Sequence, residues 1–144
     1  MVHADATVVV GKPVHEVFQF LAEGRNNALW RPTVMDVALR SGRPGTVGSV
    51  YKQGLKDKKG KRVDGDYEIT VVKQNEEINF QVVNGPDKAK GKFFLASVAD
   101  GTRVRFSLDY EARGFGKLIE DNLSKQLQVE VMHLSNLKKY LEGQ

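Results

Sequence analysis

The sequence predicts an α+β fold in which one curved antiparallel sheet of six to seven strands wraps around a long C-terminal helix. Apolar side chains between residues 34 and 111 recur with a period close to two, which is typical of strands that bury one face. After Gly114 the period changes to about 3.6, which indicates an amphipathic helix. The 144 residues carry no repeat, linker or low-complexity tract, so we expect one domain over residues 1–144.

The N-terminal part of the chain predicts a strand followed by short helices. Val2–Val10 is rich in β-branched residues and alternates between two faces. Pro13 suits the first turn of a helix, and apolar residues at helical spacing predict that helix over residues 14–21. Gly24 ends it, and a weaker helical piece covers residues 25–30 before Pro32.

Six further strands fill the middle of the chain. Turn chemistry separates them, including the Asp100-Gly101 pair, which favours a tight hairpin, and a lysine-rich turn over residues 56–62. Because the connections are short, we expect consecutive strands to pair antiparallel. The predicted strands cover residues 34–40, 49–55, 65–73, 78–83, 89–98 and 102–111.

The C-terminal segment predicts one uninterrupted helix over residues 115–141. At about 100° per residue, its apolar side chains fall within roughly 120° of one another and form a continuous stripe. A helix of about 26 residues is ~40 Å long, enough to lie across a sheet of this size. The stripe contains Ile119, Leu123, Leu127, Val131, Leu134, Leu137 and Leu141.

Composition excludes several classes of protein. Twenty-two Lys and Arg against 18 Asp and Glu give a net charge of +4, well below the charge density of a dedicated nucleic-acid binder. The absence of cysteine excludes disulfides and thiolate metal sites, and it fits a reducing cytoplasm. No apolar run is long enough to span a membrane, and the first residues lack the basic start of an export signal. We therefore expect a cytoplasmic protein without an integral membrane segment that binds no nucleic acid.

The sequence carries no motif of a known cofactor or metal site. Gly-x-Ser-x-Gly, Walker, dinucleotide and His-Glu-x-x-His patterns are absent. Glu130-x-x-His133 has the spacing of carboxylate-bridged metal sites, but such sites need a second copy and further carboxylates. We therefore expect no cofactor and no metal. The oligomeric state is left open, a weak homodimer included.

Several short segments resemble a known superfamily in their order and spacing. They are Pro13-Val14-His15-Glu16-Val17-Phe18-Gln19-Phe20-Leu21, Trp30-Arg31-Pro32, Gly42-x-Pro44-Gly45-x-x-Gly48-Ser49-x-Tyr51 and Gly101-Thr102-Arg103-Val104. With the long terminal helix, and over essentially the whole chain, they resemble the polyketide cyclase/dehydrase and lipid-transport superfamily, also called START-like or SRPBCC. The resemblance implies a helix-grip fold with an apolar cavity between the sheet and the helix.

The resemblance implies no particular reaction, because this superfamily includes lipid carriers, hormone receptors, stress proteins, cyclases and aromatases. We expect binding or transport of a small hydrophobic ligand, such as a lipid, polyketide, isoprenoid or sterol-like compound. One alternative is a cyclase or aromatase that uses Glu, His or Tyr groups of the cavity as acid and base. Another is a chaperone-regulator-like interaction module, which an exposed apolar patch would favour.

Aromatic side chains on the inward face of the sheet are the first candidates to contact such a ligand. Strand alternation turns Tyr67 and Val71 inward and Asp66 toward water. The strand with Phe93 and Phe94 is apolar on both faces, so alternation does not decide which ring points inward. The same residues also suit a filled core, whereas a ligand cavity would measure roughly 300 to 1,000 Å³. The candidates are Trp30, Tyr51, Tyr67, Phe80, Phe93, Phe106 and Tyr110.

Gln126, Glu130 and His133 form a polar ridge along the apolar stripe of the helix, at i, i+4 and i+7. If Glu130 lies beside a dry cavity, we expect burial to raise the pKa of its carboxyl, so that it acts as acid or base near neutral pH. His133 would then share its proton. The other interpretation is an ordinary solvated flank of the helix, and the helical wheel does not distinguish the two. All three residues are candidates for ligand binding.

The lysine-rich stretch of residues 56–62 carries five positive charges, with Asp57 opposing them. Such a cluster attracts anionic membrane surfaces or nucleic-acid backbones. No aromatic residue interleaves with these charges, so we interpret the stretch as a solvated hairpin tip with Gly60 at the turn.

Overall fold

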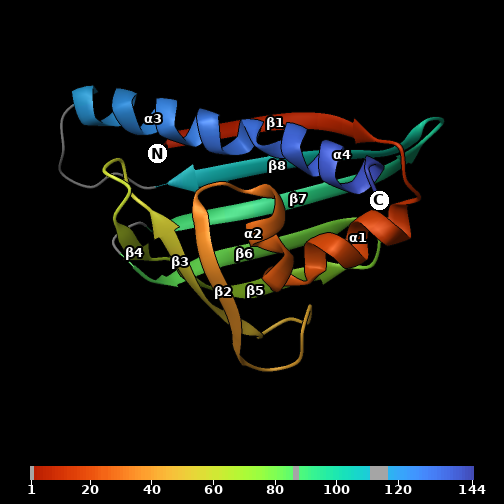
Figure 1. The fold of residues 1–144 in the computed structure, drawn as a ribbon, viewed down its shortest axis with the longest axis horizontal. Coiled ribbons are helices and arrows are strands. Elements are labelled where there is room, and N and C mark those ends of the chain that lie inside the picture. Colours follow the sequence, from red (N-terminus) through yellow and green to blue (C-terminus); the bar gives the residue numbers. More distant parts are fainter. Residues whose placement is uncertain (1, 86–87, 111–116) are drawn as a thin grey trace.

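The computed structural model describes residues 2–85, 88–110 and 117–144 as one twisted antiparallel sheet with helices packed against it (Figure 1). The strands follow the order β1-β8-β7-β6-β5-β3-β2, and β4 pairs with β3 beside this path. Every pairing between strands is antiparallel, as expected for a chain of short connections. The strands are β1 (Val2–Val10), β2 (Val34–Ser41), β3 (Val50–Lys56), β4 (Arg62–Asp64), β5 (Asp66–Lys73), β6 (Glu77–Asn84), β7 (Ala89–Val98) and β8 (Gly101–Tyr110).

Helices from both ends of the chain bury their apolar faces against this sheet. In Figure 1, α3 and α4 follow each other along β1, while α1 and α2 lie over the strands farther from that edge. Buried residues of the helices and strands belong to one hydrophobic core. The helices are α1 (Val14–Ala22), the single-turn 3₁₀ helix η1 (Gly24–Asn26), α2 (Asn27–Trp30), α3 (Lys117–Met132) and α4 (Leu134–Glu142). This arrangement confirms the α+β helix-grip class that the sequence predicts.

The sheet has eight strands in the described residues, one more than the upper end of the predicted range. The additional strand, β4, begins at the end of the stretch predicted as a lysine-rich turn, where Val63 pairs with Leu55 of β3. Arg62 stabilises this short strand, since its guanidinium donates to Asp36 at 2.9 and 3.0 Å and to Asp64 at 2.9 Å. Ion pairs between β2 and β4 and within β4 therefore extend the hairpin of β3 and β4. The tip of this hairpin is exposed to solvent, as predicted.

The C-terminal helix is interrupted once, at His133, so the prediction of an uninterrupted helix is wrong. The His133 amide donates to the Glu130 carbonyl at 3.1 Å, and the Asn136 amide donates to the His133 carbonyl at 2.8 Å. These bonds span three residues instead of four, which tightens the turn between α3 and α4. The two helices nevertheless continue in nearly one direction (Figure 1). Residues 115–116 of the predicted helix and Glu111 of the predicted last strand lie outside the described residues.

Two β-bulges change which side chains of β5 face the core. A register shift between Ile69 and Val71 moves Val72 into contact with the core, so the prediction that Val71 points inward is wrong. A second shift between Asp66 and Tyr67 leaves the Asp66 side chain buried, where the sequence predicts a solvent-facing carboxylate. A prediction from strict alternation does not account for an extra residue in one strand, so it assigns the wrong face to the side chains beside a bulge.

Asp66 remains in the interior because its carboxylate finds hydrogen-bond donors there. Oδ1 accepts from the backbone N–H of Gln53 at 3.0 Å, and Oδ2 accepts from Asn84 Nδ2 at 3.4 Å. Arg40 adds an ion pair with 3.7 Å between Nη1 and Oδ2. Partners of this kind offset the cost of burying a charge.

The structure also decides between the two neighbouring phenylalanines of β7. Phe93 is buried and stacks on Phe106 of β8, with ring centroids 4.5 Å apart. Phe94 points to the opposite face, where its ring centroid lies 5.9 Å from Cζ of Arg105. Phe93 is therefore the ring that faces the helices.

Candidate functional site

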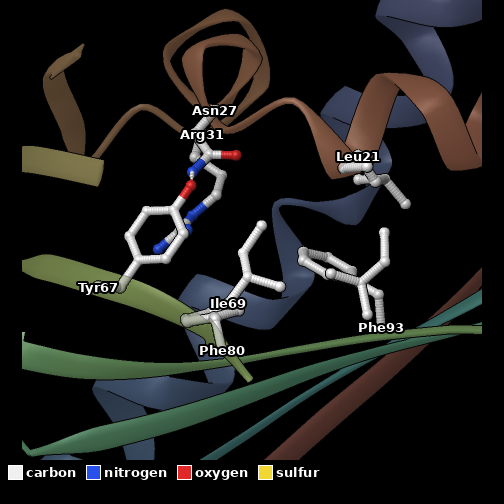
Figure 2. Close-up of a pocket in the computed structure, with 9 residues that line it drawn as sticks. Leu21, Asn27, Arg31, Tyr67, Ile69, Phe80 and Phe93 are labelled. Carbon is white, nitrogen blue, oxygen red and sulfur yellow. Dashed lines mark hydrogen bonds between the residues drawn. The ribbon is translucent and has the colours of Figure 1, made fainter. Parts of the chain in front are cut away.

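The candidate site is a pocket between the middle of the sheet and the helices α1 and α2 (Figure 2). Asn27, Arg31 and Tyr67 gather on one side of it, and apolar side chains form the rest of the lining. The centre of a water molecule finds about 10 Å³ of space in this pocket, which is the room of roughly one water. The lining residues are Leu21, Ala22, Asn27, Arg31, Tyr67, Ile69, Ile78, Phe80 and Phe93.

This volume is far below that of a site that encloses a ligand, so this pocket is not the expected cavity of roughly 300 to 1,000 Å³ in this conformation. The reason is close packing of the aromatic rings. Trp30, 2% exposed, places its ring edge-on to Phe93 and Phe106, with centroids 6.1 and 5.9 Å away. Rings that the sequence assigns to a ligand pocket thus also fill one another's space.

Two glycines allow this packing. Gly24 of η1 lies against the rings of Tyr51 and Tyr67, and a Cβ at this position would overlap the Tyr67 hydroxyl. Gly91 of β7 pairs with Phe80 of β6, and the Phe80 ring occupies the space that a Cβ of residue 91 would need. The absence of a side chain at both positions therefore sets how close the helical turn and the aromatic rings approach the pocket.

A buried hydrogen-bond network defines the first polar part of the pocket. Asn27 Nδ2 donates to the Tyr67 hydroxyl at 2.9 Å and to Gln53 Oε1 at 3.1 Å. All three residues are buried. Burial raises the pKa of Tyr67, so its hydroxyl stays neutral at physiological pH and keeps a proton to donate.

An ion pair between α2 and α3 defines the second polar part. Arg31 Nε donates to Glu130 Oε2 at 3.0 Å, and the exposed fractions of the two side chains are 7% and 14%. Thr33 Oγ1 donates to Glu130 Oε1 at 2.6 Å, and His133 Nδ1 lies 3.2 Å from Glu130 Oε2. Two segments of the chain, residues 31–33 and residues 130–133, therefore meet at one carboxylate.

The expected rise in the pKa of Glu130 is wrong. Burial does raise this pKa, but the charge of Arg31 and the hydrogen bonds from His133, Thr33 and Arg31 outweigh burial and lower the pKa to about 2. Glu130 is consequently a permanent anion at neutral pH. Helix periodicity places Glu130 inside the apolar stripe, but it does not reveal the arginine that the carboxylate contacts.

The structure gathers most of the predicted aromatic residues. Tyr51 stacks on Tyr67 with ring centroids 5.3 Å apart, and the series continues through Phe80, Phe93 and Phe106. Trp30 covers the far end of this series. Tyr110 lies apart from the pocket lining, half-buried at the end of β8.

The predicted polar ridge is only partly assembled. Glu130 and His133 contact each other, whereas Gln126 is exposed on α3 and makes no hydrogen bond to this cluster in the described part of the chain. Sequence reasoning missed Asn27, Arg31 and Thr33. The available signal was the Trp30-Arg31-Pro32 segment, in which a charged residue follows a buried aromatic, but local spacing does not show what that charge meets.

A second, open hollow follows the outer side of α3. It is lined by Lys125, Gln128, Val129, Met132 and His133. Val129 and Met132 are 61% and 56% exposed. Since these residues all come from one helix and the residue that follows it, the hollow is a surface groove and does not enclose a ligand.

Among the described residues, no group of three or more His, Asp or Glu side chains is placed to hold a metal ion. Nor does any helix in this part of the chain have the length and apolar composition needed to cross a membrane.

Solved structures with low sequence identity share this fold. A Thermus thermophilus protein superposes with a TM-score of 0.80 at 18% identity, over 95% of this chain and 94% of that chain. A START superfamily protein from Mycobacterium smegmatis gives a TM-score of 0.76 at 15% identity, over 98% and 97%. A Nitrosomonas europaea protein gives 0.72 at 16% identity, over 99% and 95%. At such identities the likeness establishes the fold alone.

Sequence comparison gives the family. No curated protein matches the chain significantly. The family model described as polyketide cyclase/dehydrase and lipid transport matches residues 1–142, which is nearly the whole chain. With the helix-grip arrangement of sheet and C-terminal helices in place, we conclude that the chain belongs to the polyketide cyclase/dehydrase and lipid transport family.

Proposed function

We propose that this protein binds one small hydrophobic molecule, of the lipid, polyketide or isoprenoid type, between the sheet and the helices. The observation that carries the proposal is a pocket with aromatic and aliphatic walls and three polar side chains on one side, Asn27, Arg31 and Tyr67. Ligand sites in proteins commonly combine apolar walls with a few polar groups that fix orientation. Membership of a family that includes lipid transport supports the same proposal.

Binding requires the interior to open, because the pocket now has room for about one water. The described side chains of α3 are less buried than those of α4. Of residues 123–132, Val131 alone is buried, whereas α4 buries Leu134, Leu137 and Leu141 in only nine residues. Displacing residues 123–132 of α3 therefore exposes fewer buried side chains than displacing α4.

The geometry favours binding over acid–base catalysis. A catalytic acid or base works best with a pKa near the operating pH, whereas the pKa of Glu130 is about 2 and that of Tyr67 is raised by burial. Both groups keep one protonation state around pH 7. They are suited to recognise polar atoms of a ligand, and the cyclase or aromatase alternative would need another proton carrier.

The test uses a neutral apolar fluorophore, N-phenyl-1-naphthylamine, and two neighbouring variants of β7. Phe93→Ala removes a ring that lines the pocket, and Phe94→Ala removes a ring on the opposite face. We expect the wild-type protein to bind the probe with a stoichiometry near one and to melt at a higher temperature when it is present. Phe93→Ala should change the dissociation constant several-fold, whereas Phe94→Ala should leave it within about twofold.

Absence of saturable probe binding would overturn the proposal, and so would equal effects of the two variants. Far-ultraviolet circular dichroism of both variants checks that the fold is retained. If Phe93→Ala fails to fold, Ile78→Val makes a smaller change in the same lining and serves the same comparison.

A further inference from the structure

The guanidinium group of Arg31 lines the pocket and has hydrogen-bonding capacity to spare. Its side chain is 7% exposed and lines the pocket. Within the described part of the chain, Nε is the guanidinium nitrogen that donates a hydrogen bond, and Glu130 receives it. The N–H groups on Nη1 and Nη2 are left for another acceptor. Neither nitrogen is among the buried atoms without a partner in the described part of the chain, so both keep contact with water, which a ligand oxygen can replace.

Aromatic rings surround the guanidinium of Arg31. Its Cζ lies 6.0 Å from the ring centroid of Trp30 and 5.7 Å from that of Phe106, so aromatic faces cover part of the group. The Trp30 Nε1 atom is itself buried without a hydrogen-bond partner among the described residues. Two consecutive residues thus present unpaired donors in one aromatic environment.

Glu130 does not use the full capacity of the guanidinium. Its Oε1 accepts from Thr33 at 2.6 Å, and its Oε2 is shared between Arg31 Nε and His133 Nδ1. Glu130 therefore accepts from Nε of Arg31. The two Nη nitrogens of the planar guanidinium are left to donate to a second acceptor. An oxyanion matches these two donors best, because charge-assisted hydrogen bonds to a guanidinium are short and directional.

We propose that the ligand carries a carboxylate, which binds the Nη1 and Nη2 edge of Arg31 while its apolar body lies among the aromatic rings. This rests on the proposed function, since it names the head group of the same ligand. Asn27 and Tyr67 line the same side of the pocket and orient the ligand near that head group. Glu130 is then a positioning residue, which holds the guanidinium through Nε and competes electrostatically with the incoming anion.

The experiment compares decanoic acid with decan-1-ol, which share an apolar chain and differ in the head group. Each displaces N-phenyl-1-naphthylamine at pH 7.5, where the acid is ionised. We expect the acid to bind roughly 10- to 100-fold more tightly than the alcohol, the usual value of a charge-assisted hydrogen bond. In Glu130→Gln the acid should bind still more tightly, because a competing negative charge is gone, and the affinity for the alcohol should stay constant.

The double variant R31M/E130Q removes the guanidinium without leaving an unpaired buried carboxylate, and it should abolish the preference for the acid while the alcohol still binds. Arg103→Met, an exposed position on β8, is the matched control for general attraction by a basic protein and should keep the preference. Equal binding of acid and alcohol to the wild-type protein would refute the carboxylate and leave the proposed function standing. If neither compound displaces the bound probe, the carboxylate proposal fails, whereas the proposed function fails only if the probe itself does not bind saturably. A preference that survives in R31M/E130Q would assign the anion to another site.

Discussion

At the scale of single residues, the environment of Glu130 gives this carboxylate its properties. The sequence places a carboxylate beside an apolar stripe, for which burial alone would raise the pKa. Arg31 and Thr33 reach it from the segment after α2, and their contacts at 3.0 and 2.6 Å keep it ionised. The same side chain that would suit proton transfer in isolation is here an anion that holds α3 against α2.

The lowered pKa of Glu130 makes stability depend on pH. A carboxyl that ionises near 4.5 in the unfolded chain and near 2 in the folded protein contributes up to roughly 3 kcal/mol above pH 4.5, and this contribution is lost as the pH falls toward 2. Glu130→Gln lacks that contribution. The gap in unfolding free energy between the wild-type protein and Glu130→Gln should therefore shrink by about 2 kcal/mol between pH 6 and pH 3.

Urea denaturation at a series of pH values measures this gap. Glu16→Gln, an exposed position on α1, is the control and should show a gap that stays nearly constant. A gap for Glu130→Gln that does not change with pH would mean that the carboxyl titrates alike in the folded and unfolded chain.

At the scale of elements, the break at His133 divides the C-terminal helix into two parts with different roles. The helix α4 turns Leu134, Leu137 and Leu141 into the core. The helix α3 packs along β1 and carries the carboxylate that pairs with Arg31, but residues 123–132 bury little of their surface. The apolar stripe runs through both helices, so the sequence did not distinguish an anchored part from a loosely packed one.

A pair of leucine substitutions tests this division. Leu137→Ala in α4 removes a side chain that is fully buried, and it should lower the free energy of unfolding by roughly 2 to 5 kcal/mol. Leu127→Ala in α3 truncates the same residue type at a half-buried position and should cost clearly less. Urea denaturation of both variants gives the comparison, and equal losses would contradict the weaker packing of α3.

At the scale of the whole molecule, the proposed binding of a ligand requires the filled interior to open. The sheet is continuous from β1 to β2, and α1 and α4 are both anchored by buried residues. Under the proposed function, we expect the opening to displace α3, whose Glu130 pairs with the pocket residue Arg31, while α4 remains in place. Ligand binding should then stabilise a conformation in which α3 lies farther from the sheet.

Spin labels report this displacement directly, because the chain has no cysteine of its own. Cysteines at Lys125 of α3 and Lys90 of β7, both exposed, give the test distance. Cysteines at Lys139 of α4 and Lys90 give the matched control. We expect saturating decan-1-ol to lengthen or broaden the first distance by several ångströms and to leave the second unchanged; an unchanged first distance would refute displacement of α3.

The sequence by itself determined the antiparallel pairing of neighbouring strands after β1, the α+β class and the aromatic inward face, because these follow from side-chain periodicity and turn chemistry, which are local. The pairing of β1 with β8 joins the two ends of the sheet and is not local. The sequence also placed Tyr51, Tyr67, Phe80 and Phe106 on that inward face correctly. Only the tertiary structure decided that Phe93 rather than Phe94 points inward, that bulges bury Asp66, and that Arg31 meets Glu130 across 99 residues of chain. Such contacts join segments far apart in sequence, and neither local spacing nor periodicity carries information about the partner. The volume of the interior was also decided only by the tertiary structure, since it depends on how all the aromatic rings pack together.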